Sequence, residues 1–319
     1  MDGVETFAKT RLVQYWLIYV LARIVIRAID LVPLAVLTVA TRFVAFLFND
    51  LFRVRRRVVN NNLQHAFPHW SAKKRRQVAR EMWQHLFLIE CEAIKARRIL
   101  NEQNWRNYID FSEKDKQRVD KYLHDDRGCI IVGCHFGNFE VGGMFTHFGY
   151  PSRYTVARPI RNPFLDRYIT QLRESMGQKM LPKKGIIPDV IDLLKKGNTI
   201  GLLADQYGGD TGCWVNFFNR PTSYHKSIAL FALIARVPIF VGSLYRSGKP
   251  MHFSMTVDGI LDPEEPRWKN ATVKEVTQWY SDLFEQIIRV APEQYWWIHR
   301  RWKVPQKQSI RRRRLKQAA

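Results

Sequence analysis

A histidine and a glutamate follow the apolar run at 130–132 in the sequence GCHFGNFE. On a regular helix, residues with this spacing point about 140° apart, so His135 and Glu140 cannot share a helical face. They can meet if His135 precedes a helix that Asn138 caps, with Gly137 in the turn before it and Glu140 in its first turn. The carboxylate would then hold the imidazole in one tautomer and leave its other nitrogen free to accept a proton. We therefore predict a general base that activates a hydroxyl of the substrate, because the pair has no serine nucleophile of its own.

Polar residues also end the predicted strands around this motif. The short apolar segments GCIIVGCH, RYTVARP and NTIGLLAD end at or next to His135, Arg158 and Asp205. In parallel sheets flanked by helices, the functional site lies at the carboxyl ends of the strands. We therefore expect these three side chains to lie at one edge of a sheet.

The segments between these strands predict helices. Strands alternating with helices are typical of an α/β fold with a mostly parallel central sheet flanked by helices. Two further strands are expected in PIFVGSLYR and PMHFSMTVDG. The expected helices are a long one after Ser71 and others at about 138–148, 163–176, 186–197, 225–236 and 271–291.

The N-terminal 50 residues are strongly apolar and contain two uncharged runs, 12–22 and 31–41, each about half the length of a membrane span. Two membrane-associated arrangements fit this pattern. One is a spanning helix with Arg23, Arg27 and Asp30 on an inward face, and the other is an interfacial helix broken at Pro33. A buried soluble hairpin is the third alternative. We predict membrane association, because the basic cluster RVRRR follows directly and would face anionic cytoplasmic headgroups. The expected organisation is a membrane anchor or interfacial helices at 1–50, an α/β domain that carries the site at 51–305 and a basic disordered tail at 306–319.

The charge balance limits the partners. The chain has 51 Lys and Arg against 29 Asp and Glu, a net charge of +22, which attracts nucleic acid, anionic lipid or an acidic protein. The basic runs flank apolar segments and do not alternate with aromatic residues, so a nucleic-acid-binding protein is only a remote alternative. The four cysteines form no CxxC motif, which predicts free thiols, and we expect neither a metal nor a cofactor.

Several blocks in order along the chain resemble the bacterial late acyltransferases of lipid A biosynthesis, the lauroyl and myristoyl transferase type. This family belongs to the glycerolipid acyltransferases that share an H-x4-D/E motif. The resemblance begins with the apolar N-terminus and includes RRRVVNNNLQHAFP, GCHFGNFE, VARPIRNPFLDRYITQLRESMG, LLADQYGGDTGCWVNFFNRPT and PEQYWWIHRRWK.

The resemblance implies transfer of a fatty acyl chain from an acyl-carrier-protein thioester to a hydroxyl of an anionic membrane lipid, a lipid A precursor. It implies a bacterial inner-membrane enzyme on the cytoplasmic face, with His135 as the general base and Glu140 as its partner. It also implies that Arg158, Asp205 and Gln206 line the site.

The residues leave several roles open. Backbone N–H groups near Gly137 and Asn138, or the Arg158 guanidinium, can stabilise the oxyanion of the transition state. Arg158, Arg161 and Arg167 can instead bind lipid phosphates, which is the role we favour for Arg158. Asp205 either binds polar groups of the acceptor or orients Arg158.

One block departs from the family's usual pattern and leaves the acceptor open. After the FF pair the family usually continues with a small, glycine-containing segment. Here the sequence is NRPTSYHKSIALFA, with Tyr224, His225 and Lys226 at that place. The alternative function is therefore acyl transfer to another membrane glycolipid or phospholipid, with acyl-CoA as the donor.

Overall fold

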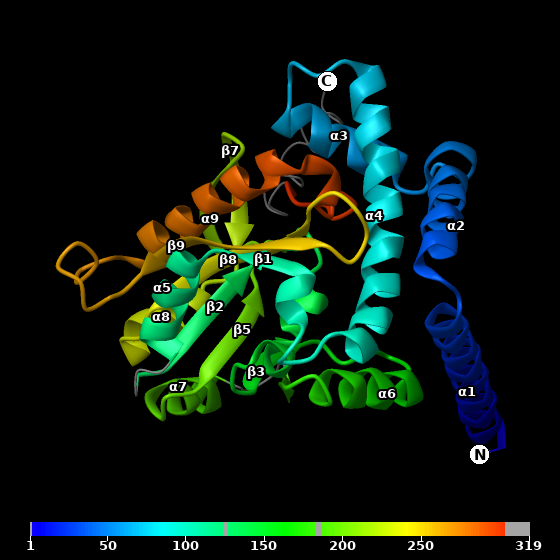
Figure 1. The fold of residues 1–319 in the computed structure, drawn as a ribbon, viewed down its shortest axis with the longest axis horizontal. Coiled ribbons are helices and arrows are strands. Elements are labelled where there is room, and N and C mark those ends of the chain that lie inside the picture. The colour runs from blue at the N-terminus through cyan, green and yellow to red at the C-terminus, as the bar shows by residue number, and fades with distance from the viewer. Residues whose placement is uncertain (1, 124–126, 183–186, 304–319) are drawn as a thin grey trace.

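The computed structural model describes residues 2–123, 127–182 and 187–303 (Figure 1). The predicted tail at 306–319 lies outside the described residues. A seven-stranded sheet forms the centre, in the order β1-β9-β8-β2-β5-β3-β4. The strands are β1 (Ile109–Phe111), β2 (Cys129–Gly133), β3 (Arg153–Ala157), β4 (Gln178–Pro182), β5 (Thr199–Leu203), β8 (Ile239–Arg246) and β9 (Phe253–Leu261).

Five adjacent strands, from β8 to β4 in the sheet order, run parallel to one another. β9 runs antiparallel to β8, and β1 pairs in parallel with β9 at the edge. The predicted α/β class with a mostly parallel sheet is confirmed, as are all five predicted strands. β1, β4 and a separate hairpin of β6 (Cys213–Phe217) and β7 (Arg220–Tyr224) were not predicted.

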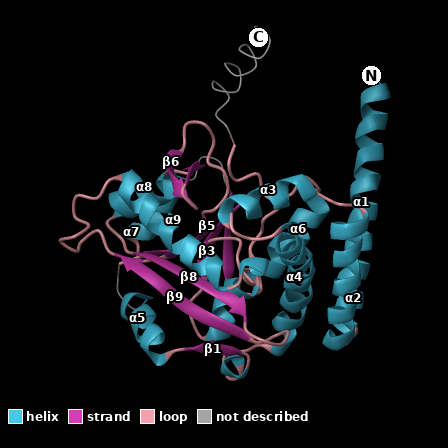
Figure 2. Cartoon of the chain, turned by 90° about the horizontal axis from the view of Figure 1, so that it is seen from above, coloured by secondary structure: helices cyan, strands magenta, loops and turns pink. Residues whose placement is uncertain are grey.

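Helices cover both faces of the sheet. Figure 2 shows α8 and α9 on one side of β8 and β9, and α5 on the other. Four predicted helices are confirmed as α4, α6, α7 and α8, and the closing helix as α9. The α-helices are α1 (Asp2–Leu31), α2 (Leu34–Phe46), α3 (Arg56–Ala66), α4 (Ala72–Ile99), α5 (Glu113–Leu123), α6 (Pro163–Glu174), α7 (Ile187–Lys195), α8 (Ser227–Ala235) and α9 (Val273–Val290).

The predicted helix at 138–148 is wrong. Two short 3₁₀ segments, Val141–Gly143 and Phe145–Phe148, replace it, and Met144 between them has ψ 55°. Gly142 and Gly143 have low helix propensity. A Cβ at Gly143 would come within 2.4 Å of the Gln178 side chain, so this segment packs closely against β4. The Asn138 side-chain oxygen accepts a hydrogen bond from the Val141 N–H at 3.0 Å, but the N-cap residue of the first segment is Glu140.

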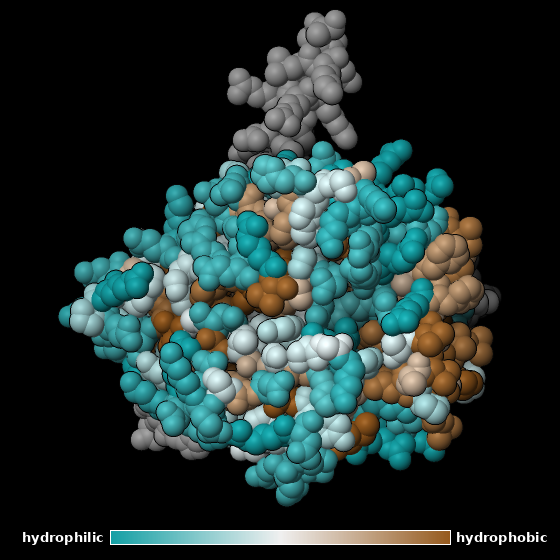
Figure 3. All heavy atoms as spheres, turned by 45° about the horizontal axis from the view of Figure 1, so that its top comes forward, coloured by the Kyte–Doolittle hydropathy of each residue, from teal (hydrophilic) through white to brown (hydrophobic). Residues whose placement is uncertain are grey.

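The N-terminal helices carry an exposed apolar surface. Segments 11–31 and 34–51 are each long and apolar enough to cross a membrane by length and composition. Figure 3 shows hydrophobic side chains gathered on the side of the molecule where Figure 1 places α1 and α2. The helix breaks at Pro33, as the interfacial arrangement requires. A buried hairpin is wrong for α1, since most of its large apolar side chains are exposed: Leu12, Val13, Trp16, Leu17, Ile18, Leu21, Ile24, Val25 and Leu31.

Polar contacts join α1 to the rest of the chain. Asp30 forms ion pairs with Arg27 in the same helix at 3.2 Å and with Arg98 of α4 at 2.8 Å. The Asn162 side chain, which caps α6, donates a hydrogen bond to the Tyr15 carbonyl at 2.7 Å. Of the charged residues predicted to share a face of α1, Asp30 is thus buried against α4, whereas Arg23 and Arg27 are exposed.

Candidate active site

The register of β2 and β5 brings two polar residues together. Gly133, the last residue of β2, pairs with Leu203, the last residue of β5, in a parallel ladder. The Ala204 N–H extends this ladder by donating to the Gly133 carbonyl at 2.9 Å. His135 and Asp205 each follow two residues after their strand, so the register sets them opposite each other.

His135 is held at three points. Its Nδ1 lies 2.6 Å from an oxygen of Asp205, and its backbone N–H donates to the other oxygen at 3.1 Å. The His135 carbonyl accepts a hydrogen bond from the Trp296 N–H at 3.0 Å. Both the main chain and the ring are therefore fixed, while Nε2 stays at the open side of the site.

The charge state of Asp205 decides the tautomer of His135. Burial acts to raise the pKa of Asp205, but the attraction and hydrogen bonds of His135 outweigh burial and lower the pKa to about 2. The carboxylate is therefore ionised at neutral pH and accepts a hydrogen bond from Nδ1–H. Nε2 is then the nitrogen with a free lone pair, as a general base requires.

A pocket opens above this pair. Its lining comes from the two strand ends, the start of α3 and the closing segment of the chain: Arg55, His135, Asp205, Gln206, Trp296, Ile298 and His299. The rings of Trp296 and Phe139 meet the imidazole edge-on, with centroids 4.7 and 5.2 Å away. The imidazole of His135 therefore lies between aromatic side chains, which limits the access of water to it.

His299 closes one side of the pocket. Its Nε2 accepts a hydrogen bond from the Tyr207 N–H at 3.2 Å. Burial, together with the nearby positive charge of Arg301, lowers the pKa of His299 to about 4. The ring is therefore neutral at pH 7 and can accept this bond, which fixes the residue after Gln206.

Glu140 has a different partner from the one predicted. Its carboxylate forms an ion pair with Arg173 of α6, with distances of 2.5 and 3.3 Å, and the carboxylate on the His135 ring is that of Asp205. The prediction that Glu140 contacts the imidazole is thus corrected. The reason is that residues 139 and 140 form a turn, and Arg173 draws the side chain toward α6.

The backbone amides of Gly137 and Asn138 are also engaged elsewhere. The Gly137 N–H donates to the Gln294 carbonyl at 3.0 Å, and the Asn138 N–H donates to the Leu244 carbonyl at 2.7 Å. Asn138 is fully buried. Neither amide is free to bind a substrate oxyanion, which corrects the role that the sequence indicated for them.

The other predicted residues lie at different distances from the base. The Gln206 side-chain nitrogen lies 3.5 Å from His135 Nε2, at the mouth of the pocket. Arg158 follows β3, on the far side of β5 from His135, and is exposed, as is Arg161 before α6. Within residues 2–123, 127–182 and 187–303, neither arginine has an ion pair. Both remain available to a charged ligand, but the structure does not bring them into the pocket lining.

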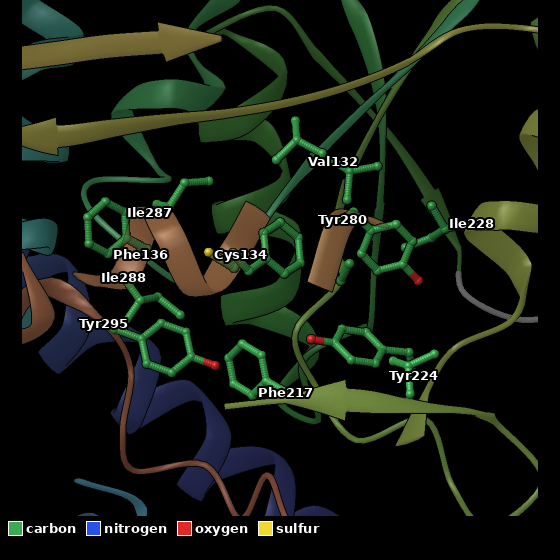
Figure 4. Packing of buried hydrophobic residues seen from close by; sticks show 14 of the residues in the cluster. Val132, Cys134, Phe136, Phe217, Tyr224, Ile228, Tyr280, Ile287, Ile288 and Tyr295 are labelled. Atoms are coloured by element: carbon green, nitrogen blue, oxygen red, sulfur yellow. The ribbon is translucent and has the colours of Figure 1, made fainter. Parts of the chain in front are cut away.

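The four cysteine thiols lie in the buried interior of the fold. Cys134 precedes His135 and points, like Phe136, into the cluster of apolar side chains in Figure 4, so His135 between them faces the opposite way. All four cysteines are buried and free. Burial raises the pKa of Cys91 and Cys129 to about 11. No thiol is therefore placed to act as a nucleophile in the pocket.

Residues 295–301, in the closing block of the sequence, contribute both to the core and to the pocket lining. Trp297 and Arg301 are almost fully buried, at 1% and 2% exposed, so they belong to the core. Trp296, Ile298 and His299 line the pocket instead. The sequence YWWIHRR places four aromatic or aliphatic residues before three basic ones, so it gave no signal of which of them are buried.

Comparison with known proteins identifies the family of the chain. Residues 5–304 match the model of a family described as bacterial lipid A biosynthesis acyltransferases. The chain belongs to this family. It is an acyltransferase, and the resemblance read from the sequence blocks is confirmed.

Individual relatives are modestly similar to this chain in sequence. The lipid A biosynthesis lauroyltransferase of Escherichia coli K12 is 28% identical over 260 residues, which cover 78% of this chain and 79% of that protein. The palmitoleoyltransferase of the same organism is 24% identical over 255 residues, with the same coverage. A phosphatidylinositol mannoside acyltransferase of Mycobacterium tuberculosis (strain CDC 1551 / Oshkosh) is 24% identical over 188 residues, covering 58% of this chain and 57% of that protein.

Proposed function

We propose that this acyltransferase moves a fatty acyl chain from an acyl-carrier-protein thioester to a hydroxyl of a lipid A precursor, with His135 as the general base oriented by Asp205. The observation that carries the proposal is the 2.6 Å contact of His135 Nδ1 with an ionised, buried carboxylate beneath an open pocket. This contact leaves Nε2 to take the proton of an attacking hydroxyl.

The reaction proceeds by direct attack. His135 Nε2 removes the hydroxyl proton as the oxygen attacks the thioester carbon, which forms the new C–O bond and a tetrahedral oxyanion. The C–S bond then breaks, and the leaving thiolate takes the proton back from the imidazolium. Asp205 stabilises the imidazolium between these steps. The Gln206 amide, 3.5 Å from Nε2, is positioned to contact the reacting groups.

Glu140 supports this site indirectly in the proposal. Its ion pair with Arg173 joins the turn after His135 to α6, whose N-terminal side carries Arg158 and Arg161. These two exposed arginines bind phosphate groups of the acceptor, since guanidinium groups form bidentate contacts with phosphate. The pair would thus keep the acceptor site and the base in a fixed relation.

The donor and the location follow from charge and hydropathy. A net charge of +22 attracts an acidic donor protein, and it also attracts the phosphate groups of acyl-CoA, so the assay below compares both donors. The apolar surface of α1 and α2, followed by the basic residues 53–57, fits the cytoplasmic face of a bacterial inner membrane. Residues 1–50 are then the membrane-associated part and residues 51–305 the catalytic part.

The test is a transfer assay with the purified full chain in mixed micelles. Donors are acyl carrier protein and CoA carrying the same acyl chain, and acceptors are a lipid A precursor and a phosphatidylinositol mannoside. We expect mass spectrometry to find the acylated lipid A precursor, formed faster from the carrier protein. Product formed only from acyl-CoA on the mannoside would overturn the proposal in favour of the activity named for the mycobacterial relatives.

Membrane association through α1 gives a second prediction. Leu17, Leu21 and Ile24 are 54%, 62% and 60% exposed. Changing all three to glutamate should move most of the protein from the membrane pellet to the soluble fraction, because three exposed apolar side chains become charged.

The matched control changes three apolar residues that are exposed on α8 and at the end of α9, away from α1: Leu230, Ile234 and Val290. This control should stay in the pellet. If both triple variants sediment as the wild type does, α1 is not what holds the protein on the membrane.

A further inference from the structure

A buried polar cluster lies directly behind the turn that carries His135. It consists of Glu92 and His85 of α4 and Arg246 at the end of β8, and we call it the Glu92 cluster. Glu92 is fully buried and His85 is 2% exposed. None of the three lines the pocket. The transfer chemistry therefore does not use them directly.

Glu92 accepts hydrogen bonds from four donors. Arg246 contacts it through Nε at 2.7 Å and Nη2 at 2.6 Å, a bidentate ion pair. The Met251 N–H donates at 3.0 Å, and the Asn138 side-chain amide donates at 2.9 Å. The last bond reaches the turn itself, three residues after the base.

His85 extends the cluster to the neighbouring residue of the turn. Arg246 Nη1 lies 2.9 Å from His85 Nδ1, and a guanidinium can only donate, so Nδ1 is the acceptor. The ring proton is therefore on Nε2, which donates to the Gly137 carbonyl at 3.1 Å. Burial and the charge of Arg246 hold the pKa of His85 well below its usual value, so the ring stays neutral.

The main chain of the turn is fixed from the same side. The Gln294 side chain forms two hydrogen bonds with the backbone of Arg246, and the Gln294 carbonyl accepts the Gly137 N–H. Gly137 has φ 61°, and a Cβ there would come within 2.0 Å of the Leu244 carbonyl oxygen. The turn therefore has one conformation, which the Glu92 cluster and its neighbours specify.

Stability alone does not account for such a cluster. A buried ion pair often stabilises a fold no better than apolar side chains of the same size, whereas it does select one arrangement of the groups around it. Here the groups held in one arrangement are Gly137 and Asn138, which follow His135 by two and three residues.

We propose that the Glu92 cluster is a positioning device: Glu92, Arg246 and His85 fix the turn at 137–138 so that His135 Nε2 points into the pocket. This inference rests on the proposed role of His135 as the base. It assigns to His85 and Arg246 a function in turnover, although neither touches a reacting atom. A displacement of about 1 Å at a catalytic group costs about 100-fold in rate.

The test compares two replacements of His85. His85→Leu removes the bond to the Gly137 carbonyl, and we expect kcat per folded enzyme to fall about 10- to 100-fold with KM nearly unchanged. His85→Gln places an amide N–H near the former Nε2 and should recover most of this loss. His65→Leu is the matched control, because His65 also contacts a backbone carbonyl, that of Phe218, outside the pocket lining.

The pH profile separates positioning from simple loss of folded protein. If the turn moves relative to Asp205, the plot of rate against pH for His85→Leu should shift along the pH axis on its acid side. A lower folded fraction lowers the rate equally at every pH and leaves the position of the curve unchanged. If His85→Leu does not fold, His85→Asn serves instead, since its amide is one methylene too short for the Gly137 carbonyl. If the wild type is active, and the folded His85→Leu or His85→Asn variant has the same kcat and the same pH profile as the wild type, the inference is overturned. An inactive wild type would overturn the proposed function itself.

Discussion

Replacing His135 with alanine should remove acyl transfer almost completely while the protein still folds and associates with membranes. General-base catalysis contributes about 10²- to 10⁴-fold to rate, and His135 is the ring whose free nitrogen faces the pocket. The side chain is mostly enclosed, and among the described residues Asp205 is the one carboxylate in contact with its ring. The loss should therefore appear in kcat, measured as acylated lipid formed per folded enzyme.

The matched control is His69→Ala, because His69 is exposed and lies outside the pocket lining. It should keep wild-type activity. A folded His135→Ala enzyme with more than a tenth of the wild-type kcat would remove the base mechanism and direct attention to His299, the other imidazole of the pocket.

Replacing Asp205 with asparagine should lower kcat about 10³- to 10⁴-fold, whereas Glu140→Gln should lower it by about 10-fold or less. An asparagine that turns its amide N–H toward Nδ1 favours the tautomer with the proton on Nε2, and this tautomer has no base in the pocket. Glu140→Gln breaks the ion pair with Arg173 but leaves the contact between Asp205 and His135 intact. Initial rates of both variants, at equal folded concentration, give the comparison.

The ranking of the two variants decides which carboxylate serves the base. A larger loss for Glu140→Gln would restore the pair that the H-x4-E spacing predicted. The assay should be carried out well above pH 4, where Asp205, with its pKa of about 2, is fully ionised. The stabilisation that Asp205 gains from His135 is likewise present above its unfolded pKa and is lost only as the pH falls through about 2.

The strands could be predicted because buried parallel strands are short, continuous apolar runs. β2, β5 and β8 follow this pattern closely, whereas Arg153 and Thr155 interrupt it in β3. β1 and β4 could not be predicted in this way, since β1 has only three residues and β4, Gln178–Pro182, includes polar side chains that lie at the sheet edge. The helix predicted at 138–148 is wrong because the prediction relied on the apolar residues and on Asn138 as a cap. It gave too little weight to Gly142 and Gly143, which have low helix propensity.

The partner of His135 could not be predicted because sequence order does not give strand order. β5 comes after β3 and β4 in the chain but lies between β2 and β3 in the sheet. Only this insertion puts Asp205 beside His135. The spacing within GCHFGNFE is visible in the sequence, so Glu140 was predicted as the partner of His135. Asp205 was recognised as a residue at the end of a strand but not as this partner.

The burial of every cysteine has a practical consequence for following this enzyme at a bilayer. The four native thiols are at most 7% exposed, so reagents in solution reach them slowly, and a raised pKa keeps Cys91 and Cys129 protonated. A single cysteine introduced on the outer side of α1 would then be the one fast-reacting thiol. It would accept a fluorescent reporter of membrane depth without removal of Cys134, which adjoins His135, the proposed base.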